Sequence, residues 1–205
     1  NADLPGIASA DQSRINMSDR VVFAPPAGST PAEHELYLTY RLGPVLEKLG
    51  QVVIPTGIVQ VTRSPRNGEA GMARVVKMFG EMLQGQRLIP YDSSAAMVKG
   101  HPTPITNGRS GKVRWISGDP VLPQLQHYIV LDISKNDGVS TGDQVELFEP
   151  RQGPKEGRPL AIPEISIAHA QVLRVTQYGA TAIITAQEQP KISEGTSGRI
   201  AAKMP

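Results

Sequence analysis

Hydrophobic and polar residues alternate along much of the chain. The clearest example is the stretch Glu-Leu-Tyr-Leu-Thr-Tyr-Arg at residues 35–41. A period of two places successive side chains on opposite faces of a β-strand. We therefore expect a half-buried strand with Leu36, Leu38 and Tyr40 on its inner face and Tyr37 on its outer face.

Further strands are expected where β-branched and aliphatic residues cluster between turn-forming residues. In the first half these runs are 21–24, 51–55, 58–63, 73–79 and 87–90. In the second half they are 112–116, 127–131, 144–148, 171–176, 180–185 and 198–200. The only helical turn that we expect is a short one at residues 45–49. The abundance of glycine (20) and proline (18) fits short strands joined by many turns, so the sequence predicts an all-β protein.

Changes in composition divide the chain into four parts. Residues 1–19 are polar and are expected to form an extended N-terminal arm. The strands of residues 20–91 form a first β module. Residues 92–111, rich in Pro, Gly and Ser, form a connector, and residues 112–205 form a second β module.

The two modules match in the order and spacing of their strands, which predicts an internal duplication. The matched segments are 21–23 with 129–131, 36–38 with 145–147, 58–62 with 172–176 (both ending in Val-Thr), 73–76 with 181–184, and 85–89 with 195–200. A unit of five or six short antiparallel strands hides its edges by curling into a barrel. The expected fold is therefore two tandem small antiparallel β-barrel-like modules.

Glycines mark the tight turns of the second module. Gly142-Asp143, directly before an alternating strand, predicts a turn in which glycine takes backbone angles that other residues avoid. Gly138 and Gly195 are expected to serve in the same way. The first module has residues 31–34, Pro-Ala-Glu-His, at the position of the Gly142 turn, so we expect the turn to be lost there.

Composition and charge exclude several functions. The net charge is +2 and no basic run is interleaved with aromatic residues, so the signature of a nucleic-acid-binding protein is missing. The absence of cysteine excludes disulfides and thiolate chemistry, and it fits an oxidising compartment. No stretch approaches the ~18 consecutive apolar residues of a membrane span. The start without Met suggests a processed, exported precursor.

No motif in the sequence supports catalysis. Residues 132–143 resemble a calcium-binding loop only superficially, because the sixth position is Asp137 rather than glycine and strands are expected on both sides. The Gly-Lys pair at residues 111–112 lacks the spacing and the following Ser/Thr of a phosphate-binding loop. The four histidines lack metal-ligand spacing, and no nucleophile-elbow pattern occurs. We therefore expect no enzyme activity, no metal and no cofactor.

Candidate partner contacts are chosen from exposed aromatic and arginine positions, since these residue types are enriched at interface hot spots. Trp115, the only tryptophan, fits a partner-facing anchor and equally fits a plug of the second module's core. We also expect partners at the loops where the modules differ, residues 29–35, 64–71 and 151–163. The candidates are Tyr37, Arg63, Arg66, Arg114, Trp115, Arg151 and Lys155.

Three runs of the second module carry a resemblance to known proteins. They are Gly-Val-Ser-Thr-Gly-Asp-Gln-Val-Glu-Leu-Phe at 138–148, Ala-x-Val-Leu-Arg-Val-Thr-Gln-Tyr-Gly-Ala-Thr-Ala-Ile-Ile-Thr at 170–185, and Glu-Gly-Thr-Ser-Gly-Arg-Ile at 194–200. Together they resemble the C-terminal β-barrel module of exported bacterial envelope proteins that carry LysM domains. They are also similar to the small barrel at the end of flagellar outer-ring proteins. The first module resembles a degenerate copy.

Proteins of this kind also resemble a membrane-extrinsic subunit of the reaction-centre–light-harvesting complex of phototrophic bacteria. This resemblance implies a non-catalytic, periplasmic scaffold that binds protein subunits of a membrane complex. The alternative is a cell-wall-associated module cleaved from a LysM-type precursor and linked to peptidoglycan. No LysM domain lies in this chain, so sugar binding is not implied for it.

Overall fold

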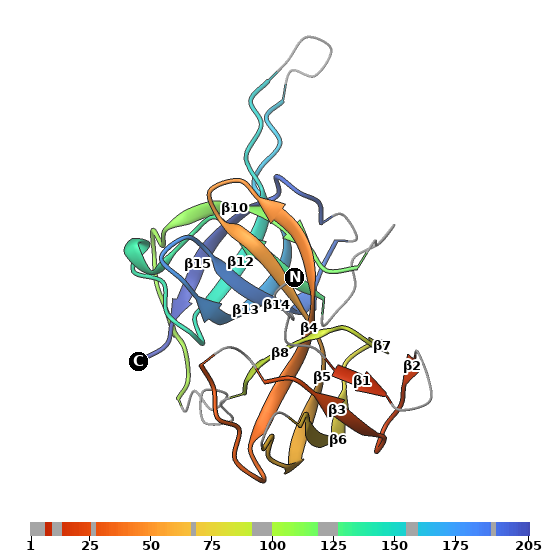
Figure 1. Ribbon diagram of the computed structural model, residues 1–205. Helices are drawn as coiled ribbons and strands as arrows, with labels where there is room; N and C mark the ends of the chain where they lie inside the picture. Colours follow the sequence, from red (N-terminus) through yellow and green to blue (C-terminus); the bar gives the residue numbers. More distant parts are fainter. Residues whose placement is uncertain are drawn as a thin grey trace. The chain divides into compact units, whose positions relative to one another are not determined.

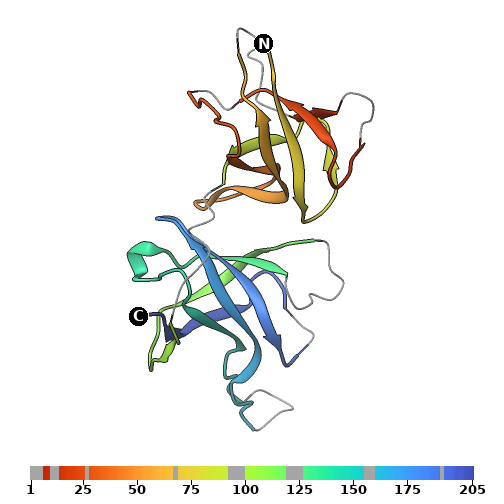
Figure 2. The same cartoon turned by 90° about the horizontal axis from the view of Figure 1, so that it is seen from below.

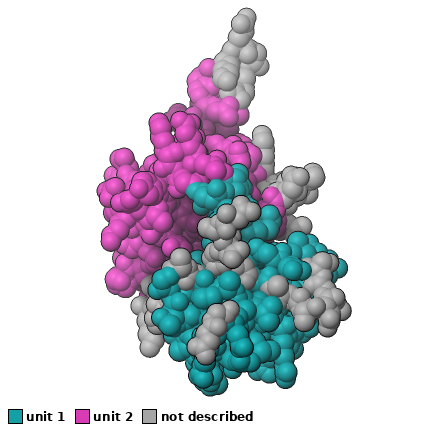
Figure 3. Space-filling model, in the orientation of Figure 1, with its two compact units in different colours: residues 1–44, 51–95 teal, residues 45–50, 96–205 magenta. Residues whose placement is uncertain are grey.

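The computed structural model describes residues 7–9, 14–25, 28–66, 69–91, 100–118, 127–154, 160–189 and 192–205. Within these ranges the regular elements are β-strands and one turn of 3-10 helix, which confirms the all-β class. The chain divides into two compact units, residues 1–44 with 51–95 and residues 45–50 with 96–205 (Figure 3).

The first unit is built on a six-stranded sheet with the order β1-β3-β6-β5-β4-β8, beside which β2 pairs with β7. A long hairpin joins β4 to β5, and its tip, residues 45–50, groups with the second unit. The strands are β1 (Ile7–Ser9), β2 (Arg14–Ile15), β3 (Arg20–Phe23), β4 (Leu36–Leu46), β5 (Gly50–Arg63), β6 (Gly71–Met78), β7 (Met82–Leu83) and β8 (Arg87–Pro90).

The second unit contains a closed barrel of six strands in the order β10-β11-β14-β13-β12-β15, because β10 pairs with both β11 and β15 (Figures 1 and 2). The short β9 adds to β15 outside this ring. The elements are β9 (Thr103–Pro104), β10 (Ser110–Ile116), β11 (Tyr128–Leu131), the 3-10 turn η2 (Lys135–Asp137), β12 (Gln144–Glu149), β13 (Ile165–Val175), β14 (Ala180–Gln187) and β15 (Ser197–Lys203).

Each unit has its own hydrophobic core, supplied by alternate residues of its strands. Ile129, Leu131, Leu147 and Ile184 are among the fully buried residues of the barrel. The core of the first unit includes Ile7 and Ile15, which lie in the stretch that was expected to be an arm. In the structure this stretch therefore contributes two short strands, β1 and β2, whose isoleucines are buried in the first unit's core.

Three further expectations need correction. The inner face of β4 carries Tyr37 and Thr39 (3% and 0% exposed), whereas Leu36 and Leu38 are only half-buried. Residues 45–49 end a strand and form a hairpin turn instead of a helical turn. The connector contributes β9 and the start of β10 to the second unit's sheet.

The turn before β4 was expected to differ from the turn before β12, but the two have the same geometry. His34 has a φ of 72° and Gly142 a φ of 92°, so a histidine takes the left-handed conformation where the second unit uses glycine. The His34 amide donates to the Val61 carbonyl (2.9 Å), and the Gly142 amide donates to the Val172 carbonyl (2.7 Å). The two turns differ in sequence, but they make the same backbone hydrogen bond.

Asp143 fixes this turn to the C-terminal strand. Its carboxylate is fully buried and accepts hydrogen bonds from the amides of Ser140 (2.8 Å) and Met204 (2.9 Å). It also forms an ion pair with the Lys203 ammonium at 2.6 Å. Glu35 takes the corresponding place in the first unit, but it is exposed, and it accepts from the Ala32 amide at 3.0 Å.

We predict that Asp143→Ala lowers the free energy of unfolding by about 3 kcal/mol, because it removes a buried charged acceptor and leaves its donors unsatisfied. The matched change Glu35→Ala should cost only about 1 kcal/mol, since water replaces an exposed acceptor. Urea denaturation of both variants measures the difference. Equal losses would contradict the anchoring role of Asp143.

Candidate interaction surfaces

The most prominent surface feature is a hairpin arm, defined here as the described residues 149–154, at the end of β12, and 160–165, which lead into β13. It projects away from the barrel in Figure 1. Backbone hydrogen bonds between Gln152 and Ile162 (3.0 and 2.9 Å) continue the ladder beyond the strands. The side chain of Leu160 is 78% exposed and that of Ile165 is 37% exposed. The arm therefore presents apolar groups to the surroundings.

The base of the arm is held by Arg199 on β15. Its guanidinium pairs with Glu146 on β12 and with Glu164 on the returning side of the arm, each at 2.7 Å. It also lies 4.7 Å from the centre of the Phe148 ring, within range of a cation–π contact. The hydrogen bond to Glu146 is the main reason why the pKa of Arg199 is raised. These contacts fix the direction in which the arm leaves the barrel.

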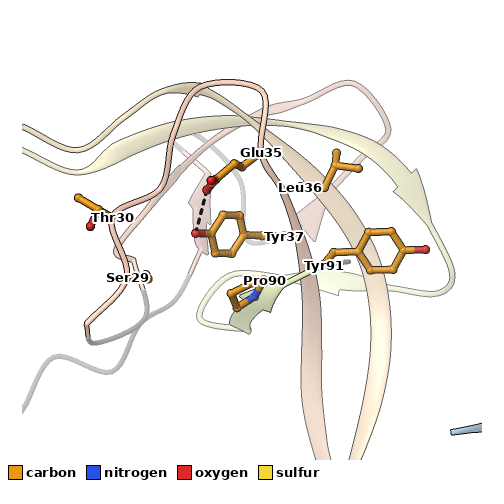
Figure 4. A pocket seen from close by; sticks show the side chains of 7 residues that line it. All are labelled: Ser29, Thr30, Glu35, Leu36, Tyr37, Pro90 and Tyr91. Atoms are coloured by element: carbon orange, nitrogen blue, oxygen red, sulfur yellow. Dashed lines mark hydrogen bonds between the residues drawn. The ribbon is translucent and has the colours of Figure 1, made fainter. Parts of the chain in front are cut away.

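A second feature is an open depression of about 420 Å³ in the first unit, where β4 begins beside the end of β8. Figure 4 shows the Tyr37 ring between Glu35 and Pro90. The Tyr37 hydroxyl donates to the Glu35 carboxylate at 3.4 Å. Burial, with a smaller contribution from the Glu35 charge, raises the pKa of Tyr37, although a hydrogen bond with the Ser29 side chain opposes the shift. The site is shallow and mostly apolar.

The residues proposed as partner contacts from the sequence do not gather in one place. Tyr37 is buried, so its assignment to an outer face is wrong. Arg63 is paired with Glu69 (2.6 Å) and Arg114 with Asp132 (2.7 Å). Trp115 is half-buried on β10, which does not decide between a partner-facing anchor and a core residue. Of the remaining candidates, Arg66 is exposed in the β5–β6 connection, Arg151 is exposed on the arm, and Lys155 lies outside the described residues.

The turn glycines lie in turns that need them. Gly138, Gly142 and Gly195 have φ angles of 77°, 92° and 88°, which side chains rarely adopt. Gly138 ends η2, and Ser134 and Asp137 form a capping box at its start. Hydrogen bonds from the Ser134 amide and hydroxyl are the main reason why the pKa of Asp137 is lowered. Each carboxylate of residues 132–143 is thus bonded within the protein: Asp137 to its own loop, Asp132 to β10, and Asp143 to Ser140 and the C-terminal strand.

Sequence reasoning missed one feature, the pair Arg20 and Arg74. These residues lie opposite one another on β3 and β6, and both are exposed. They are more than fifty positions apart in the chain, and only the strand register brings them together. Nothing local in the sequence indicated that they would occupy opposed positions on one face of the sheet.

Two site classes are missing from the part of the chain that the structure describes. It contains no group of three or more His, Asp or Glu side chains placed to hold a metal ion. It also contains no helix long and apolar enough to cross a membrane. No protein-family model matches the chain, and no curated protein matches it.

Tyr37 gives a pH-dependent prediction. Because its pKa is raised, the folded protein holds the phenolic proton more tightly than the unfolded chain does. This stabilisation is complete below the ordinary tyrosine pKa of about 10 and is lost as the pH rises through the folded value. Tyr37→Phe should cost about 0.5 kcal/mol at pH 8 and flatten the fall in stability as the pH rises above about 10.

Urea denaturation across this pH range measures the effect. Tyr178→Phe is the control, because Tyr178 is 57% exposed in the turn between β13 and β14. The control should follow the parent protein at every pH. If Tyr37→Phe also follows the parent, the buried phenol has no part in alkaline stability.

Proposed function

We propose that this protein is a non-catalytic, exported scaffold that binds the periplasmic face of a membrane protein complex. The observation that carries the proposal is the hairpin arm, which is held at its base and exposes apolar side chains away from the barrel. An apolar side chain as exposed as Leu160 gains free energy when a partner covers it. A fixed arm also loses little conformational entropy on docking.

The more specific proposal is a membrane-extrinsic subunit of a photosynthetic reaction-centre–light-harvesting complex. It rests on the resemblance carried by residues 138–148, 170–185 and 194–200. In the structure these runs form a turn with β12, the β13–β14 hairpin, and a turn with β15. These runs therefore build the barrel itself. The arm lies between the first run and the second run in the sequence. Periplasmic location and protein partners follow from the same resemblance and belong to the proposal.

We also propose that the two units derive from one ancestral module, which makes the chain a tandem pair of barrels. The strand orders support this, since β1-β3-β6-β5-β4-β8 and β10-β11-β14-β13-β12-β15 follow the same path. The irregularities support it too. The register between β5 and β6 shifts after Ile58 and after Val61, and that between β13 and β14 shifts after His169 and after Val172.

These registers also revise the alignment of the two halves. They match Gln60-Val61-x-Arg63 with Gln171-Val172-x-Arg174, instead of matching the two Val-Thr pairs. They match Ala73 with Ala182, both fully buried, instead of with Thr181. Matching registers with matching bulges support a common origin more strongly than a matching number of strands does.

Native purification tests the function. We predict that the tagged protein, extracted with mild detergent, co-purifies with integral membrane subunits. Leu160→Glu should reduce the recovered subunits at least about tenfold, because a charge replaces an apolar contact. Tyr178→Glu is the matched control, since Tyr178 is equally a surface residue of the second unit but lies outside the arm.

A protein that purifies alone under these conditions would contradict the scaffold proposal. Sedimentation with purified peptidoglycan tests the alternative that the protein is a cell-wall-associated module. A scaffold stays in the supernatant, whereas a peptidoglycan-linked module pellets. Equal recovery of membrane subunits with Leu160→Glu and Tyr178→Glu would mean that the arm does not contact the partner.

A further inference from the structure

The outer face of the first unit's sheet carries two cross-strand rows. In the first row Arg20 of β3 lies opposite Arg74 of β6, and in the second Val22 lies opposite Met72. Both arginines are exposed, Val22 is 37% exposed and Met72 is half-buried. Gln60 of β5 continues the first row on the far side of Arg74. The two strands run side by side in Figure 1.

Two arginines opposite one another are unfavourable for an isolated sheet. Directly opposed residues have Cβ atoms about 5 Å apart, and like charges in such a pair destabilise the strand pairing. The guanidinium group does not lose its proton at any ordinary pH, so the repulsion is permanent. In the described part of the chain neither arginine has a carboxylate partner. Five of the ten other described arginines form an ion pair, namely Arg14, Arg63, Arg109, Arg114 and Arg199. What sets Arg20 and Arg74 apart is that they lie directly opposite one another.

The second unit shows that the fold does not require this arrangement. By register, the equivalent row on β11 and β14 is Tyr128 opposite Ile183, with Gln171 beyond it in place of Gln60. An aromatic residue and a β-branched residue form a favourable cross-strand pair. The same strand positions are thus apolar in one unit and doubly charged in the other.

We propose that the Arg20–Arg74 row is a recognition site for a carboxylate on an acidic, extended segment of a protein partner. Two exposed guanidinium groups on directly opposed strand positions can hold the two oxygens of a carboxylate with charge-assisted hydrogen bonds. The bound anion also removes the repulsion between the arginines. The site lies on the first unit, apart from the hairpin arm, and the inference does not depend on the proposed membrane complex.

The neighbouring row defines the rest of the ligand. Rows on one face of a strand are two residues apart, about 6.8 Å. An extended segment with an acidic residue, one spacer and an apolar residue therefore places its carboxylate on the arginines and its apolar side chain on Val22 and Met72. Two charges beside an apolar row favour such a peptide over a nucleic-acid backbone, which requires a longer basic stripe.

A capped peptide, Ser-Glu-Ser-Leu-Ser, tests the site by NMR titration of the full chain. We expect saturable shifts at the Nε–Hε signals of Arg20 and Arg74 and at the amides of β3 and β6. The same peptide with Gln in place of Glu should bind at least about tenfold more weakly. The double variant Arg20→Tyr, Arg74→Ile, which copies the second unit, should weaken binding of the acidic peptide to a similar extent.

The design separates loss of the site from loss of the fold. The double variant should keep the spectrum of the remaining residues and unfold at an equal or higher urea concentration, because it removes a like-charge pair. Equal shifts at all exposed arginines, such as Arg14 and Arg109, would overturn the proposal. So would binding of the Gln peptide as tight as that of the Glu peptide. Binding to phosphatidylglycerol vesicles through Arg20 and Arg74, without binding of the acidic peptide, would instead identify a lipid surface and contradict the protein ligand.

Discussion

The closure of the second sheet on itself is the constraint on which the rest of the structure depends. Six short strands leave two edges with unpaired backbone groups unless the first and last strands meet. Here β10 pairs with β11 on one side and with β15 on the other. The Val113 amide and carbonyl bond the backbone of Thr196 and Gly195 (2.9 and 2.8 Å) at this seam. Once the ring is closed, alternate side chains must fill its interior, and the hairpins and outer rows become the available surfaces.

The surfaces we assign to binding are therefore additions to a barrel whose interior is already satisfied. The arm extends one hairpin of the ring, and Arg199 ties it to the wall through Glu146 and Glu164. The Arg20–Arg74 row uses the outside of another strand pair. Both surfaces lie on the outside of their own unit, so neither disturbs a core.

Sequence alternation was sufficient for the all-β class and for most strand positions, because a period of two is a local property. It failed where the outcome depends on distant partners. Tyr37 was placed on the outer face because Leu36 and Leu38 are more hydrophobic, but the pairing of β4 with β8 turns Tyr37 and Thr39 inward. The turn at His34 was expected to be lost because it lacks the glycine of the Gly142 turn, yet both turns make the same backbone hydrogen bond. Arg20 and Arg74 became neighbours only through the register.

Amide hydrogen exchange of the full chain tests the shared architecture most directly. The first unit repeats the seam of the second, since Ile7 bonds Gln86 and Gly85 (3.0 and 2.7 Å) as Val113 bonds Thr196 and Gly195. If both units are versions of one closed module, the amides of Ile7, Gly85, Val113 and Gly195 should all be protected against exchange. Rapid exchange of Ile7 and Gly85 beside slow exchange of Val113 and Gly195 would contradict a common module.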